Sequence, residues 1–303
     1  MAGGSRTARV SAPTARADVP PWAEGALAAQ AEQRTVEVEG CAIATRAWGD
    51  PGDPGLVLVH GGAAHARWWD HVAPLFAADR RVVALDLSGH GDSGRREAYP
   101  PTTWAREVAE VVEAHELRRP AVVGHSMGGF VSILVAATIG DRLTGTVVVD
   151  SPVRRPDPER VEARRGRMFA APKTYPSREA AVGHFVLVPP QPCEERWLLE
   201  HVAHNSVREA DDGWTWKFDP AVFGRFDTRD PVFGDHLEQA RGPIAVLHGA
   251  LSSIVDRDVT DWMAQRLGRP APFIEIPGAH HHLILDQPLA FVTAVRTLLA
   301  TWA

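Results

Sequence analysis

The chain alternates two kinds of apolar pattern from residue 35 onward. Short apolar runs such as LVLV at 56–59 and VVVD at 147–150 show no polar alternation, which is typical of strands buried on both faces of a parallel sheet. The predicted strands are Thr35–Glu39, Ala42–Trp48, Leu56–His60, Arg81–Asp86, Ala121–Gly124, Thr146–Asp150, Pro243–His248 and Pro272–Ile276. The predicted helices between them are Trp69–Ala78, Thr103–Glu116, Met127–Ile139, Val259–Leu267 and Leu289–Thr301. This repeated β-then-α order predicts an α/β fold with a doubly wound, mostly parallel sheet.

The alternation breaks between residues 151 and 235, where the sequence becomes rich in proline. An insertion of about 85 residues is too long for an ordinary loop. It begins where a strand ends, at the edge on which α/β sheets bind ligands, so we expect an inserted, mainly helical cap that shapes a pocket. Trp197, Trp214 and Trp216 are its candidate substrate-binding residues. The expected division is a flexible N-terminal tail at 1–34, an α/β core at 35–150 plus 236–303, and the cap at 151–235.

Composition and charge exclude several classes of protein. The 303 residues carry 32 Lys and Arg against 38 Asp and Glu, a formal net charge of −6, so the chain lacks the basic excess of a nucleic-acid binder. Two cysteines, Cys41 and Cys193, supply neither a disulfide framework nor a cysteine zinc site. No apolar run is long enough for a secretory signal or a membrane span. We therefore expect a soluble cytoplasmic protein, with a homodimer compatible with the sequence.

The strongest chemical signal is the segment Gly124-His125-Ser126-Met127-Gly128-Gly129. It follows the predicted strand AVVG and precedes the apolar helix FVSILVAATI, which gives a G-x-S-x-G motif in strand–turn–helix context. The small residues permit a sharp turn and a close approach of the helix to the strand. A glycine-rich turn without chemistry is the alternative reading, but the placement favours Ser126 as a nucleophile.

Further motifs resemble those of the α/β-hydrolase superfamily, and they arrive in its order along residues 35–303. They are His60-Gly61-Gly62, Asp86–Ser93, the GHSMGG turn and a histidine-containing loop at 277–288. The resemblance implies a fold with an oxyanion hole and no cofactor. Its two donors would be the backbone N–H groups of Gly62, with Ala63 as an alternative, and of Met127.

The final loop resembles the family's histidine loop. Alignment on Asp286-Gln287-Pro288 puts His280 at the usual glycine position and His281 at that of the catalytic base. Three adjacent histidines also suggest a metal site. However, consecutive side chains diverge and no nearby acid or cysteine completes a ligand set, so we expect no metal.

The acid of the triad departs from the commonest pattern. Ser252 stands where the family usually has an aspartate after the seventh strand, and serine cannot stabilise an imidazolium by charge. Asp150 ends the sixth predicted strand, where certain esterases, lactonases and haloalkane dehalogenases place their acid. We predict Asp150 as the triad acid and keep Asp256 as the alternative; an aspartate at this strand end can also be purely structural.

These assignments predict a serine hydrolase that cleaves a small-molecule carboxylic ester or lactone through a Ser-His-Asp triad and an acyl-enzyme. A carbon–carbon bond hydrolase or a cofactor-free haloperoxidase of the same fold is the alternative within the enzymes. A non-catalytic small-molecule receptor that keeps the hydrolase pocket is the alternative from another class. A nucleic acid or membrane partner is not expected.

Overall fold

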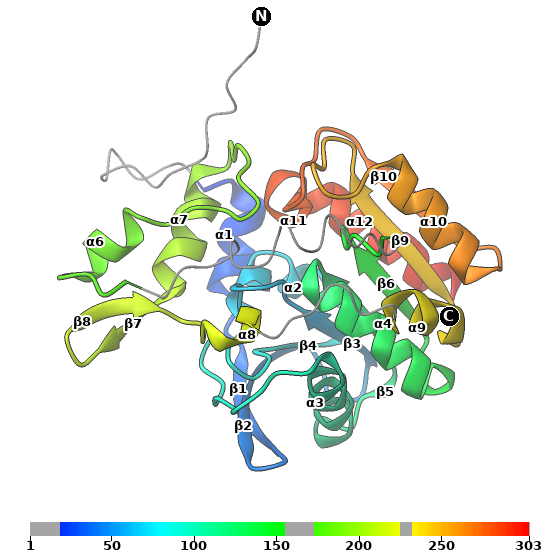
Figure 1. Ribbon diagram of the computed structural model, residues 1–303, viewed down its shortest axis with the longest axis horizontal. Coiled ribbons are helices and arrows are strands. Elements are labelled where there is room, and N and C mark those ends of the chain that lie inside the picture. Colours follow the sequence, from blue (N-terminus) through cyan, green and yellow to red (C-terminus); the bar gives the residue numbers. More distant parts are fainter. Residues whose placement is uncertain (1–18, 155–172, 225–231, 303) are drawn as a thin grey trace, which may run out of the picture.

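The structure, a computed structural model, describes residues 19–154, 173–224 and 232–302 (Figure 1). Its centre is an eight-stranded sheet of order β1-β2-β4-β3-β5-β6-β9-β10. The strands are β1 (Glu32–Val38), β2 (Cys41–Trp48), β3 (Pro54–Val59), β4 (Arg81–Leu85), β5 (Arg118–His125), β6 (Gly145–Val149), β9 (Ile244–Gly249) and β10 (Phe273–Ile276). Strand β2 is antiparallel to both neighbours and the other neighbouring pairs are parallel. The predicted doubly wound α/β sheet is confirmed.

Helices cover both faces of the sheet because successive side chains of a buried strand point to opposite sides. In β3, Val57 and Val59 belong to one apolar cluster, whereas Leu56 and Leu58 belong to the other. The first cluster includes helices α3 (Pro101–Ala114), α4 (Met127–Ile139), α9 (Val232–Gln239) and α10 (Arg257–Leu267). The second includes α1 (Pro21–Ala28), α2 (Ala73–Phe76), α11 (Leu283–Asp286) and α12 (Pro288–Thr301). The sheet is thus the middle of three layers.

Helix α4 lies very close to the strands because of its glycines. A Cβ atom at Gly128 would clash with the carbonyl oxygen of Val59, and one at Gly124 would clash with the carbonyl oxygen of Gly128. Only glycine permits this approach of backbone to backbone. The first turn of α4 is therefore held beside the end of β3.

The described part of the expected cap contains helices and a hairpin. Its elements are α6 (Arg178–Val182), α7 (Arg196–Asn205), the antiparallel strands β7 (Val207–Ala210) and β8 (Gly213–Trp216), and α8 (Ala221–Gly224). The sequence did not indicate this hairpin. Residues 155–172 and 225–231 of the expected cap lie outside the described residues. Cap residues such as Leu198 and Val202 join the apolar cluster on the α12 side of the sheet.

The expected boundaries differ from the structure most in the tail, after β3 and at the end of the expected cap. Helix α1 lies inside the expected tail, with Pro21 at its start and Ala23 buried; residues 1–18 of that tail lie outside the described residues. The helix expected at 69–78 is a 3-10 turn at Ala66–Trp69 followed by α2, because Pro74 has no N–H to continue a helix. Helix α9 begins within the expected cap but packs on α4 and α10 of the core. Among the described helices, none is long and apolar enough to cross a bilayer.

Candidate active site

Ser126 occupies the sharp turn between β5 and α4, and its backbone is strained. Its φ of 55° and ψ of −116° lie in a region that non-glycine residues rarely adopt. Hydrogen bonds hold it there: Ser126 N–H donates to the Val149 carbonyl (2.8 Å), while the Ser126 carbonyl accepts from Ser151 Oγ (2.8 Å) and Gly129 N–H (2.9 Å). This is the backbone arrangement of a nucleophile elbow, which displays its side chain at the carboxyl edge of the sheet.

The two expected oxyanion donors lie side by side at this turn. Met127 is the first residue of α4, so its N–H has no acceptor within the helix. The turn after β3 lies against it: a Cβ at Gly61 would come within 3.2 Å of Ser126 Cβ, and one at Gly62 within 3.7 Å of Met127 Sδ. The geometry therefore brings Gly62, Ser126 and Met127 together.

His60 fixes that turn to the neighbouring loop. Its Nδ1–H donates to the Gly61 carbonyl (2.7 Å), and its Nε2 accepts from Leu87 N–H (3.0 Å). Burial lowers the pKa of His60 to about 4, so the ring is neutral at pH 7 and can accept at one nitrogen while donating at the other. This role is structural, joining the loops that follow β3 and β4.

His281 and Asp150 are in direct contact. His281 Nδ1 lies 2.8 Å from Asp150 Oδ1, and the two side chains are 2% and 0% exposed. The carboxylate also accepts from Gly249 N–H at Oδ2 (2.8 Å) and from Ser252 Oγ at Oδ1 (2.7 Å). A buried carboxylate with three donors is well satisfied and can orient an imidazole. The Nε2 atom of His281 then remains for proton transfer.

Asp256 has a different environment. It is the N-cap of α10, where its Oδ1 accepts from Val259 N–H (3.0 Å), and it pairs with Arg154 at 3.6 Å. The hydrogen bond from Val259 N–H is the main cause that lowers the pKa of Asp256. Its side chain is 59% exposed. Of the two candidate acids, the structure brings only Asp150 to His281.

The histidine loop is held from both the core and the cap. His125 Nε2 donates to the His281 carbonyl (3.0 Å). From the cap, Gln191 accepts from His282 N–H (2.8 Å) and donates to Asp286 (3.0 Å). Asp286 also accepts from His280, at the backbone N–H (2.8 Å) and at Nδ1 (3.1 Å). The loop conformation therefore depends on a cap residue that the sequence analysis did not identify.

A group of histidines at this loop has the composition of a metal site. One nitrogen each from His125, His281 and His282 lies within 4.8 Å of the others, and all three residues are buried. The third member is His125, whereas the sequence analysis considered His280, which instead contacts Asp286. Burial lowers the pKa of His125 to about 3 and that of His282 well below its ordinary value, so both rings are neutral. An ion bound there through His281 Nε2 would occupy the lone pair that a general base needs.

The three cap tryptophans contact other parts of the molecule than the Ser126 turn. Trp197 is buried against Trp22 of α1 (5.9 Å between ring centroids) and His71 (6.4 Å). Trp216 packs against Tyr175 and Phe185, and Arg178 lies over the ring of Trp214. Trp214 and Trp216 therefore pack within the cap, whereas Trp197 packs the cap against α1 and the core.

Among the described cap residues, Phe223 reaches the Gly62 turn. A Cβ at Gly62 would lie 3.0 Å from Phe223 Cε1. Sequence reasoning missed this residue because α8 has only 4 residues, too few for a periodic apolar pattern that would mark a buried face.

Comparisons with known proteins agree with this fold. The family model described as "Alpha/beta hydrolase family" matches residues 56–295. The esterase Rv0045c of Mycobacterium tuberculosis is 29% identical over 293 residues, which cover 91% of this chain and 95% of that protein. A crystal structure of that esterase has a TM-score of 0.72 at 25% identity and covers 92% of this chain and 95% of its own. The 3-hydroxybutyrate-oligomer hydrolase of Cupriavidus necator is 25% identical over 269 residues, covering 83% and 91% of the two chains.

Proposed function

Since the chain belongs to the alpha/beta hydrolase family, we propose that it is a serine hydrolase that cleaves a carboxylic ester or lactone through Ser126, His281 and Asp150. The observation that carries the proposal is the buried 2.8 Å contact between His281 Nδ1 and Asp150 Oδ1, at the same sheet edge as the strained Ser126. The names of two relatives, an esterase and a hydrolase of 3-hydroxybutyrate oligomers, support hydrolysis of an ester.

In the proposed mechanism, Ser126 Oγ attacks the carbonyl carbon while His281 Nε2 takes its proton. The negative charge on the carbonyl oxygen is stabilised by the N–H groups of Gly62 and Met127, and Asp150 stabilises the imidazolium. His281 then gives the proton to the departing alkoxide, leaving Ser126 acylated. A water molecule deprotonated by His281 attacks the acyl-enzyme and releases the acid and Ser126. None of these steps uses a cofactor.

The decisive test replaces Ser126 with alanine and measures hydrolysis of p-nitrophenyl butyrate. We expect a loss of kcat of about 10⁶-fold, as for nucleophile removal in other serine hydrolases. Ser177→Ala is the control, because Ser177 caps the cap helix α6 and lies outside the site. A fluorophosphonate probe should label Ser126 in the wild type. Full turnover by Ser126→Ala would reject the nucleophile assignment; a wild type that is neither labelled nor active would indicate the receptor alternative.

A further inference from the structure

A short cap segment is attached to the core loop that follows β4. The backbone of Gly91 donates to the Lys217 carbonyl, and the backbone of Asp219 donates to the Gly89 carbonyl, both at 2.7 Å. Between these bonds, His90 and Phe218 form an antiparallel β-bridge. The segment 217–219 is therefore held to this core loop by backbone hydrogen bonds, and we call it the return segment.

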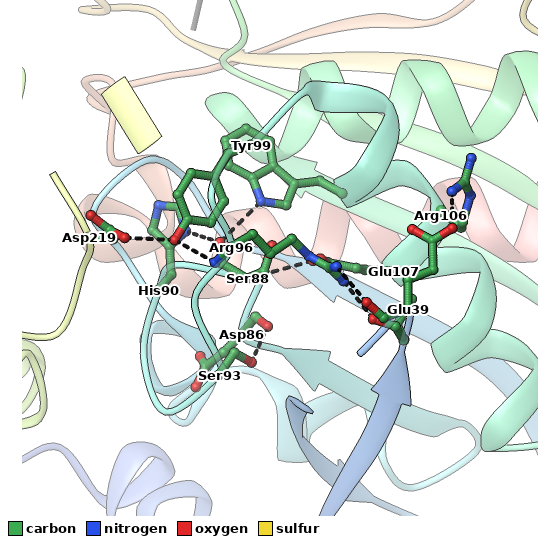
Figure 2. Close-up of polar contacts among 12 residues, drawn as sticks. Glu39, Asp86, Ser88, His90, Ser93, Arg96, Tyr99, Arg106, Glu107 and Asp219 are labelled. Atoms are coloured by element: carbon green, nitrogen blue, oxygen red, sulfur yellow. Dashed lines mark hydrogen bonds and ion pairs between the residues drawn. The ribbon is translucent and has the colours of Figure 1, made fainter. Parts of the chain in front are cut away.

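Side chains fix the return segment further (Figure 2). Tyr99 OH donates to Asp219 Oδ2 (2.7 Å) and accepts from Arg96 N–H (3.0 Å). Burial is the main cause that raises the pKa of Tyr99 to about 12, so the phenol keeps the proton it donates. Arg96 in turn pairs with the fully buried Glu107 of α3 at 2.9 Å, and Glu107 accepts from Ser88 N–H (2.9 Å). Asp219 is thus tied through Tyr99 and Arg96 to a buried charge network of the core.

The return segment leads directly into α8 and places Phe223. Asp219 Oδ1 accepts from Ala221 N–H (3.0 Å), and its carbonyl accepts from Val222 N–H (3.1 Å), so Asp219 shapes the start of α8. The Phe223 ring lies against the turn at Gly62 and 6.5 Å from the ring of His90, centroid to centroid. A half-buried aromatic ring from the cap therefore lies beside the proposed oxyanion hole.

The strand order indicates which part of a substrate would meet this ring. The Gly62 turn follows β3 and the His90 loop follows β4, both on one side of β5. Asp150 and His281 follow β6 and β10 on the other side. The departing alkoxide must lie within reach of His281 to receive its proton. The acyl group of the ester is then directed to the Gly62 side.

On the premise of the ester hydrolysis proposed above, we propose that Phe223 limits the size of the acyl group that the site accepts, and that Asp219 is a positioning residue for its ring. The enzyme then favours short acyl chains. The hydrogen bonds of Asp219 fix the start of α8, so the backbone that carries the Phe223 ring cannot move aside without breaking them. A larger acyl group would have to displace it.

The test compares kcat/KM for p-nitrophenyl acetate, butyrate and octanoate in variants of Phe223. Phe223→Ala should raise the octanoate-to-acetate ratio about tenfold or more, the scale on which a hydrophobic pocket discriminates a few methylene groups. Phe223→Trp should lower the ratio. The matched control is Phe273→Ala, because Phe273 starts β10 at the amino edge of the sheet, opposite the site. Ratios that stay at the wild-type value in both Phe223 variants would overturn the proposal.

Labelling by a fluorophosphonate separates this result from a failure of the proposed function. A wild type that turns over esters and is labelled, together with unchanged ratios in the Phe223 variants, rejects only the role of Phe223. A wild type without turnover or labelling rejects the ester hydrolysis on which the role depends.

The role of Asp219 has its own measurement. Asp219→Ala should raise the octanoate-to-acetate ratio in the same direction as Phe223→Ala but by less, and Tyr99→Phe should do so as well. Asp219→Asn should change the ratio less than Asp219→Ala, because its single amide oxygen can replace one of the two acceptors that Tyr99 OH and Ala221 N–H use, but not both. An equal loss of kcat/KM for all three esters in Asp219→Ala would show a purely structural role and reject the positioning.

Discussion

The hydroxyl group of Ser252 donates a hydrogen bond of 2.7 Å to Oδ1 of Asp150, the same oxygen that contacts His281 Nδ1. Ser252 follows β9 and Asp150 follows β6, and these strands are neighbours in the sheet. The serine at the family's usual acid position and the aspartate at the alternative position therefore contact each other. The carboxylate reaches His281 from the end of β6, and the serine supports it.

Loss of the Asp150 charge should reduce activity far more than loss of the Asp256 charge. Asp150→Asn favours the wrong tautomer of His281, so we expect kcat to fall about 10⁴-fold. Asp256→Asn is the matched control, since asparagine still caps α10 and the residue is not in contact with His281. Steady-state kinetics with p-nitrophenyl butyrate measure both. A larger loss in Asp256→Asn would show that the triad acid is Asp256, in the loop after β9.

The contact between Ser252 and Asp150 predicts that the acid can be moved. The double variant Asp150→Asn, Ser252→Asp places a carboxylate at position 252, whose present side chain is in hydrogen-bond contact with that of Asp150. We expect its kcat to be at least about tenfold higher than that of Asp150→Asn alone. Ser252→Ala removes one hydrogen bond to the charged carboxylate, worth about 1.5–3 kcal/mol, and should lower kcat by no more than about 100-fold, well short of the loss in Asp150→Asn. Equal activity of the double and single variants would show that position 252 cannot orient His281.

Gln191 should couple the cap to the catalytic loop. Gln191→Leu leaves His282 N–H and one side of Asp286 without their present partner, at a cost of about 1–3 kcal/mol for each buried group. We expect a lower melting temperature and a lower kcat. Asn205→Leu removes a cap amide that bonds only locally, to the His201 carbonyl, and should leave kcat unchanged. An unaltered kcat in Gln191→Leu would show that the contacts of this cap residue do not control the position of His281.

Acid should destabilise the fold through its buried histidines. Burial lowers the pKa of His60 to about 4 and that of His125 to about 3, so between pH 6.5 and these values the unfolded chain binds more protons than the folded one. The free energy of unfolding therefore falls as pH falls from 6.5 toward 4, by up to about 1.4 kcal/mol per pH unit for each group. Above pH 6.5 both states are neutral at these rings and the effect disappears.

Urea unfolding between pH 7 and pH 4.5 measures this slope. His125→Asn should reduce the slope by about one proton relative to the wild type. His184→Asn is the control, because His184 is an exposed cap residue. Identical slopes in the wild type and His125→Asn would contradict the role of buried His125.

Chelation should leave the activity intact. Dialysis against EDTA removes no group that the proposed steps use, so we expect kcat to remain at the wild-type value. Excess Zn²⁺ should instead inhibit, because coordination by His281 together with His125 and His282 competes with proton transfer. His280→Asn should be inhibited like the wild type, since His280 is outside this group. A loss of activity on chelation that Zn²⁺ restores would contradict the cofactor-free mechanism.

Much of the fold and the nucleophile turn followed from the sequence because their signals are local. Apolar runs without alternation predicted the parallel strands. The glycines around Ser126 predicted a sharp turn with close contact between strand and helix, because a larger residue would clash with the backbone there. The α/β-hydrolase fold is confirmed. His281 was predicted from a motif within its own loop, and its catalytic role remains a prediction.

Tertiary structure alone decided the relationships between loops. Asp150 and Asp256 were both available along the chain, and the choice between them depends on the order of β6, β9 and β10 in space. His125 joins the histidine loop, and Phe223 reaches Gly62, across large sequence separations. Hydrophobic periodicity specifies which face of a helix or strand is buried, but not which loops contact each other. That information arises only when the sheet order brings the carboxyl ends of separate strands to one edge.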